Sequence, residues 1–137
     1  GRLFVEWMED IQRDCKAAAE EGFAEQAKAL GSALEQLGAA AAHIGQIAKS
    51  GALEASVVNA VNFQRAMGWV ALGHEALDQA RVARRLIDSG TTNSRLTGKL
   101  LNLDFLVGSM LPYVGALTKV IRSADTSCLD PALFNLE

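Results

Sequence analysis

The chain has 137 residues, enough for a single domain with a buried core. Half of its residues are hydrophobic, only two are prolines and few are aromatic, which favours long helices and argues against a β-sandwich or barrel. The net charge of −3 is not segregated into blocks, and no uninterrupted apolar run approaches the roughly 20 residues of a membrane span, so we expect neither a nucleic-acid nor a membrane partner.

Apolar residues recur at three- and four-residue steps and predict helices over residues 2–20, 23–49, 52–89 and 95–123, before a tail that starts at 125. Asparagines and β-branched residues weaken the start of the third helix, which allows a separate turn there. Short links make successive helices antiparallel. We therefore expect an all-α fold, an up-down-up-down four-helix bundle with a short C-terminal tail, as one domain over 1–137.

Four local signals mark the ends and irregularities of these helices. Gly22 can end the first helix, and Asn93 or Ser94 can cap the fourth. Pro112 lies inside the fourth helix, and its ring clashes with the carbonyl of Gly108. We therefore expect a kink near Gly108.

A column of glycines at a spacing of seven runs along the second predicted helix: Gly31, Gly38 and Gly45. Glycine inside a helix costs about 1 kcal/mol relative to alanine, so the repetition suggests a use. The favoured interpretation is close approach of a neighbouring helix backbone. The alternative is a groove in which a ligand or a partner helix lies along the glycines.

The histidines do not predict a metal site, because neither follows a glutamate at the Glu-x-x-His spacing of bundle metal centres. His74 and Asp78 lie one turn apart, and we interpret them as a hydrogen-bonded pair on the helix surface. His43 lies among alanines and is expected to be a half-buried structural residue.

Other candidates for chemistry also favour structural roles. Cys15 belongs to the apolar face of the first helix, and no histidine neighbours Cys128 in the sequence. No phosphate-binding loop or nucleophile motif occurs. The basic cluster Arg81, Arg84 and Arg85 is the best candidate for binding an anion or partner, although pairing with acidic residues one turn away is the simpler interpretation. We expect no catalytic, cofactor-binding or metal-binding residue in this chain.

The cysteines and the start of the chain bear on its context. Cys15 and Cys128 are far apart and form no Cys-x-x-Cys pair, which favours a reduced, cytoplasmic protein. The sequence starts at Gly1 without a methionine and without a signal peptide. This start suggests a fragment of a larger protein, and a processed start or a tag scar would look the same.

An ordered set of motifs gives the chain a family resemblance. The most specific part is Lys99, Phe105 and the pair Leu111-Pro112, which resembles a lysine–aromatic–Leu-Pro pattern; Asp104 and Leu106 depart from it. The earlier motifs are Gly1-Arg2-Leu3-Phe4, Asn59-Ala60-Val61-Asn62-Phe63 and Met67-Gly68-Trp69-Val70-Ala71-Leu72-Gly73-His74. Together they resemble the extra C-terminal helical domain of a subgroup of acyl-CoA dehydrogenases that includes enzymes acting on methylthiopropanoyl-CoA.

The resemblance implies that the parent enzyme binds FAD and oxidises the Cα–Cβ bond of an acyl-CoA thioester. The catalytic glutamate and the flavin site of the family lie upstream of this domain. The chain itself is then an accessory bundle whose partners are the remainder of the parent enzyme and another subunit.

Two other functions remain open. A free-standing helical module could dimerise through an apolar seam, and a small-ligand carrier could use the glycine column as its groove. Docking on a larger body predicts an exposed apolar patch, with Phe4, Trp7, Phe63, Leu133 and Phe134 as its candidates. The tail could instead fold back on the bundle through Leu129, Leu133, Phe134 and Leu136 after a short turn at Asp130-Pro131.

Overall fold

The computed structural model describes residues 1–134, and their regular structure is entirely helical, as the sequence predicts. Short π-helical (η1, η2) and 3₁₀ (η3, η4) segments interrupt or follow the α-helices. The elements are α1 (Arg2–Ala18), η1 (Ala19–Phe23), α2 (Ala24–Lys49), α3 (Leu53–Val57), α4 (Ala60–Asp88), α5 (Ser94–Phe105), η2 (Leu106–Met110), α6 (Pro112–Arg122), η3 (Ser127–Leu129) and η4 (Pro131–Phe134).

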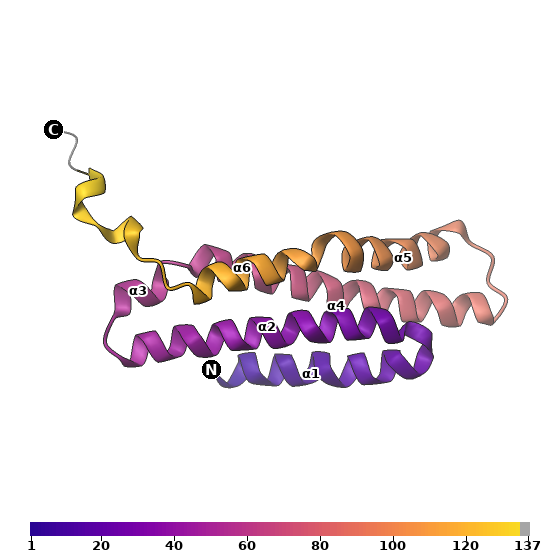
Figure 1. Ribbon diagram of the computed structural model, residues 1–137. Helices are drawn as coiled ribbons and strands as arrows, with labels where there is room; N and C mark the ends of the chain where they lie inside the picture. The colour runs from indigo at the N-terminus through magenta and orange to yellow at the C-terminus, as the bar shows by residue number, and fades with distance from the viewer. Residues whose placement is uncertain (135–137) are drawn as a thin grey trace.

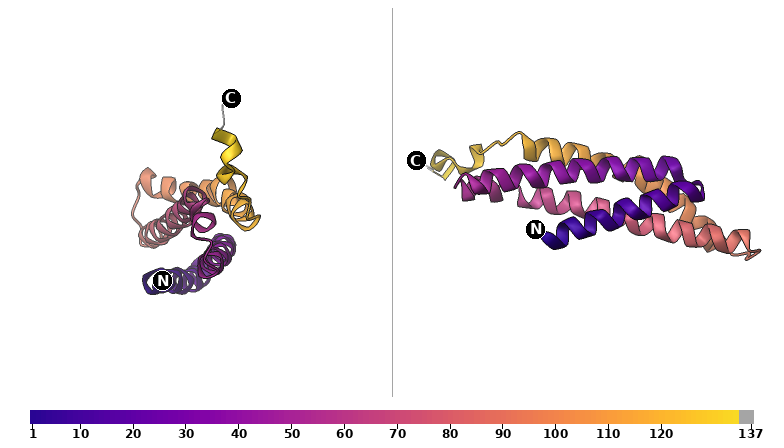
Figure 2. Two further views of the ribbon diagram at one scale, coloured as in Figure 1. Left: turned by 90° about the vertical axis from the view of Figure 1, so that its left-hand side faces the viewer. Right: turned by 90° about the horizontal axis from the view of Figure 1, so that it is seen from below.

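The long helices α1, α2 and α4 alternate in direction along the bundle, and α5 with α6 returns beside α4 (Figure 1). The helices α2 and α4 are central, because α1 and α6 each pack against both of them (Figure 2). The predicted count of four continuous helices is not confirmed. The predicted helix over 95–123 is divided at η2. The predicted helix over 52–89 is divided into the short helix α3 and the long helix α4.

The first reversal of the chain takes place inside η1. Gly22 has a φ of 95°, a conformation that residues with a Cβ rarely adopt. The turn is therefore compact enough to bring α2 back directly along α1. This confirms the prediction that Gly22 ends the first helix.

The break between α3 and α4 falls on asparagine, as the sequence allows. The Nδ2 of Asn62 donates to the Oδ1 of Asn59 at 2.9 Å, and the backbone of Asn59 is not helical. Asparagine and β-branched residues are weak helix formers, which accounts for the split of the predicted helix over 52–89 into α3 and α4.

The last long helix is irregular where Pro112 predicts it. The N–H of Leu111 donates to the carbonyl of Leu106 at 2.9 Å, so the turn before the proline is one residue wider than an α-turn. Pro112 then occupies the first turn of α6, where its missing N–H costs least. At the other end, Asn93 caps α5 by accepting a hydrogen bond from the N–H of Arg95 at 2.9 Å.

The core lies between α1, α2, α4 and α6 and consists mainly of leucine, alanine and valine. At its centre, Gly73 of α4 lies where a Cβ would come within 3.1 Å of Leu111 and 3.2 Å of Leu30. This glycine therefore allows three helices to approach one another. The fully buried large side chains are Ile11, Leu30, Leu34, Leu37, Val70, Leu77, Leu103, Val114 and Ile121.

The glycine column on α2 does not mediate backbone contact. Added Cβ atoms at Gly31 and Gly45 would meet no atom within 4 Å, and at Gly38 the neighbour is the flexible end of Met8, at 2.8 Å. The predicted close approach of a helix backbone is therefore wrong, because α1 reaches α2 through a side chain. The sequence pattern identified the spacing but not Gly73, which has the closer packing role.

The segment 94–122 comprises α5, η2 and α6. By length and composition it could cross a membrane, and only 17% of its most apolar 18-residue window is buried. The segment has no uninterrupted apolar run of that length, and it passes the test because its charges are few and its leucines and valines keep the mean hydropathy high. Composition alone is weak evidence, since the core helices of soluble proteins pass the same test.

Candidate functional site

Large apolar side chains are exposed on α4, α5 and α6. These side chains remain at least 42% exposed, although their helices also contribute to the core. Burying apolar side chains of this size against another protein surface is energetically favourable. We define the outer apolar surface as Leu72, Val82, Leu86, Leu101, Phe105, Tyr113 and Val120.

A shallow groove of about 450 Å³ crosses this surface between α4 and α6. Trp69 and Tyr113 stack in it with their ring centroids 6.5 Å apart, and Arg65 lies at its side. The other lining residues are apolar or small: Gly68, Leu72 and Leu117. The groove thus offers two aromatic rings and one cation, the residue types that anchor protein interfaces.

The outer apolar surface shares no residue with the predicted patch. Leu133 and Phe134 are exposed as predicted, at 59% and 75%, so the alternative in which they dock on the bundle is wrong; Leu136 lies outside the described residues. Phe4, Trp7 and Phe63 instead pack together, with Phe4 5.8 Å from Trp7 and 6.0 Å from Phe63 between ring centroids.

The main residues that the sequence interpretation missed are Leu101 and Phe105, which share one face of α5 and are 64% and 58% exposed. Both lie off the predicted heptad seam. An apolar pair one turn apart outside the seam was the available signal for a second buried face.

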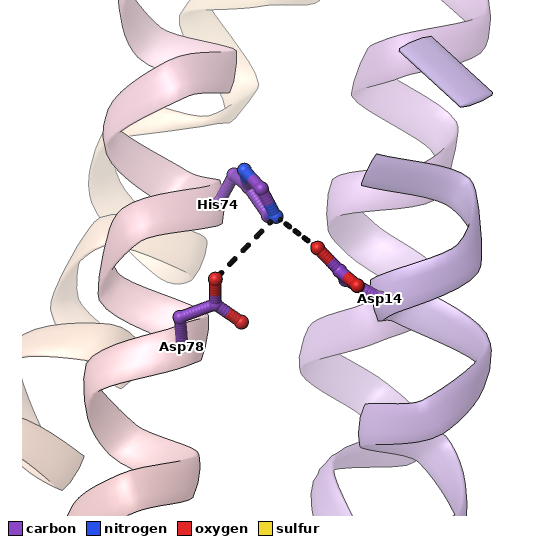
Figure 3. Close-up of side chains that lie close together, drawn as sticks. All are labelled: Asp14, His74 and Asp78. Carbon is purple, nitrogen blue, oxygen red and sulfur yellow. Dashed lines mark hydrogen bonds and ion pairs between the residues drawn. The ribbon is translucent and has the colours of Figure 1, made fainter. Parts of the chain in front are cut away.

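A polar cluster joins α1 to α4 at a different place in the bundle. The Nε2 of His74 lies 2.8 Å from an Oδ2 of Asp14 and 3.7 Å from the Oδ2 of Asp78 (Figure 3). The predicted hydrogen bond between His74 and Asp78 is therefore wrong, because 3.7 Å is too long for one. Asp14, which no spacing in the sequence connects to His74, makes that bond instead. These are the described residues that could hold a metal ion, with ligand atoms within 4.8 Å of one another.

The basic cluster on α4 serves as a link between helices. Arg81 donates two hydrogen bonds to Glu21 of η1, at 2.9 and 2.7 Å, and a weaker one to Asp78 at 3.3 Å. The hydrogen bond from Arg81 holds the pKa of Glu21 below its usual value. The prediction of pairing one turn away is confirmed for Asp78, whereas Arg84 is exposed and Arg85 lies 3.8 Å from Glu21.

Two further candidates lie in or beside the core. Cys15 is buried, and burial with the nearby charges of Asp14 and Asp78 raises the pKa of its thiol to about 11, so it is an inert core residue as predicted. His43 is half-buried as predicted, but its Nε2 has no hydrogen-bond partner. The exposed Cys128 is a free thiol.

Taken together, the described residues define a helical bundle domain with an exposed apolar surface on its outer helices. The family model described as "Acetyl-CoA dehydrogenase C-terminal like" matches residues 7–131, and the chain belongs to this family of acyl-CoA dehydrogenase C-terminal domains. No curated protein and no solved structure matches the chain. The identification made from sequence motifs is thus confirmed at the level of the family.

Proposed function

We propose that this chain is the accessory C-terminal domain of an FAD-dependent acyl-CoA dehydrogenase, and that its outer apolar surface packs against the remainder of that enzyme. The parent oxidises the Cα–Cβ bond of an acyl-CoA thioester, and the subgroup that includes methylthiopropanoyl-CoA dehydrogenases is the one its motifs resemble. Flavin and thioester bind to the parent rather than to this bundle, in the cytoplasm.

The observation that carries the proposal is the combination of the family match with the exposure of Leu101 and Phe105. A domain that functions alone gains by burying such side chains against its own core, whereas here they point outward from α5. The description of the family supports this choice of partner, because a C-terminal domain would share its polypeptide with an enzyme body, and that body would be the nearest surface to which it can pack.

A double substitution tests the role of this face. Leu101→Gln with Phe105→Gln removes two apolar contacts on one helix face but keeps helix propensity and folding, because neither residue is buried. The matched control is Leu53→Gln with Val57→Gln on α3, which has the same spacing and similar exposure, at 68% and 59%.

We expect the α5 pair to weaken binding of this chain to the separately expressed upstream body by about 30-fold or more, the effect of losing a central interface contact. Isothermal titration calorimetry measures it. Equal affinities for the α5 variant and the α3 control would contradict packing through this surface. An upstream reading frame without a flavin-binding domain would contradict the proposed parent.

The alternative is a free-standing module that dimerises through the same surface, which the stacked Trp69 and Tyr113 in the groove would equally suit. Sedimentation velocity distinguishes the two. A concentration-dependent dimer of the isolated chain that the α5 substitutions abolish would favour the alternative, whereas a monomer that binds the upstream body supports the accessory domain. Binding to lipid vesicles instead of to the body would assign the apolar segment to a membrane.

A further inference from the structure

The side chains of Asp14, His74 and Asp78 lie close enough together to be ligands of one metal ion. They come from two helices that pack directly, α1 and α4, so the rigid bundle fixes their separation. His74 and Asp78 are four residues apart on α4, and Asp14 faces them from α1 (Figure 3). One imidazole with two carboxylates is a donor set suited to zinc and its neighbours in the first transition row.

We propose that Asp14, His74 and Asp78 form a binding site for a divalent cation of the zinc class, with water completing the coordination. Neighbouring ligands of tetrahedral zinc lie about 3.3 Å apart, because each ligand atom is about 2.0–2.1 Å from the ion. The two distances from His74 Nε2, 2.8 and 3.7 Å, lie on either side of this value. Small rotations of the side chains therefore suffice to make room for the ion.

The surroundings of the carboxylates support this role. Each aspartate directs its Oδ2 at His74 and its Oδ1 toward an arginine: Arg13 lies 3.6 Å from Asp14, and Arg81 lies 3.3 Å from Asp78. The hydrogen bond from Arg81 orients Asp78, as outer contacts orient ligands in protein metal sites, whereas Arg13 makes only an ion-pair contact with Asp14. In both aspartates the oxygen nearer to His74 is the one that does not face an arginine.

Burial is also appropriate for a site that exchanges its ion with solvent. The side chains of His74 and Asp14 are 16% and 24% exposed, whereas Asp78 is 43% exposed. Water can therefore reach the cluster beside Asp78, and the ion can enter without unfolding of the bundle. Because α1 and α4 both contribute ligands, a bound ion would cross-link them.

The simpler role of the same residues is an ion pair, in which a protonated His74 lies between the two aspartates. That arrangement also joins α1 to α4, but it forms without a metal ion. The two roles differ in one measurable property. A metal site gives stabilisation that rises with the concentration of zinc and stops at one equivalent, whereas the ion pair does not respond to zinc.

The test uses the 137-residue chain, whose buried core is formed by its own helices, in a Cys128→Ser background so that the exposed thiol binds no zinc. After treatment with EDTA, ZnCl₂ is titrated by isothermal titration calorimetry and the melting temperature is recorded. We expect one equivalent to bind and the melting temperature to rise by on the order of 5 °C or more at saturation. EDTA should reverse the rise.

The variants Asp14→Asn, His74→Ala and Asp78→Asn should each weaken zinc binding by at least about tenfold. The asparagine variants keep the shape of the native side chains, so the test does not depend on the folding of the alanine variant. His43→Ala, which removes the other histidine, is the matched control and should bind zinc as the parent does. Tetrahedral Co²⁺ absorption that is lost only in the three variants would identify the ligands independently.

Absence of saturable zinc binding in the chain would overturn the proposal and leave the ion pair as the role of the cluster. Binding that persists unchanged in the His74 variant would overturn it as well. Neither result concerns the outer apolar surface, so failure of the metal site and failure of the proposed docking are distinguishable.

Discussion

The central helix α4 and the outer helix α5 differ in how many of their residues are buried. Seven residues of α4 are buried, spaced along most of its length, whereas Leu103 is the one buried residue of α5. Arg81 of α4 forms an ion pair with Glu21 of η1, whereas Lys99 of α5 donates a hydrogen bond to the amide oxygen of Gln79 on α4, at 2.7 Å. Much of α4 therefore belongs to the core, whereas most of α5 stays exposed.

The largest expected effect separates these regions by equivalent leucine truncations. Leu34→Ala removes a fully buried side chain of α2 and should lower the free energy of unfolding by about 2–5 kcal/mol. Leu101→Ala removes the same atoms from an exposed position and should change it by less than about 0.5 kcal/mol. Urea denaturation measures both. Similar losses at the two sites would show that α5 is buried in the chain's own structure.

Two glycines sharpen the comparison between close packing and open surface. Gly73→Ala introduces a Cβ against Leu111 and Leu30, both buried, and should destabilise the chain by about 1 kcal/mol net of the better helix propensity. Gly31→Ala places its Cβ in open space and should stabilise by up to about 1 kcal/mol. Thermal denaturation of the two variants checks the opposite signs. A stabilising Gly73→Ala would mean that the surrounding leucines shift freely.

The smallest effect concerns the ion pair of Glu21 with Arg81 and its dependence on pH. Because the hydrogen bond from Arg81 holds the pKa of Glu21 below its usual 4.5, the contribution to stability is present above that pH and is lost as pH falls through the lowered value. Glu21→Gln should therefore lower the melting temperature slightly at pH 7, and the difference from the parent should shrink toward pH 3. Glu20→Gln, in the same turn, is the control. A difference that is constant with pH would contradict this account.

Most of the helices could be predicted from the sequence, because their existence depends on local periodicity that each segment carries itself. Gly22, Asn93 and Pro112 also act locally, and each has the effect that its backbone chemistry predicts. The prediction for the glycine column failed because the contacts of a helix face depend on which neighbouring helix packs against it. The α2 glycines share a spacing with packed glycines, but only the position of α1 decides that Met8 rather than a backbone reaches Gly38.

The two functional features show the same limit in different degrees. The spacing of His74 and Asp78 could be read from α4, whereas Asp14 is 60 residues earlier and joins them only through the packing of α1. The apolar pair on α5 was visible in the sequence, but its exposure follows from the helix having core on one side only. The family could nevertheless be identified from the sequence, because its motifs are spread along the whole chain rather than confined to one segment.

The wide turn at η2 has a consequence for how this surface changes in evolution. Each helical residue advances the chain by about 100° around the axis, so losing one residue from 106–110 would rotate all of α6 by about 100° relative to α5. Tyr113 would then leave the side of Trp69 while Leu101 and Phe105 stayed in place. The single extra residue sets the phase between two halves of one surface, and its insertion or deletion offers related chains a one-step route to a differently shaped partner.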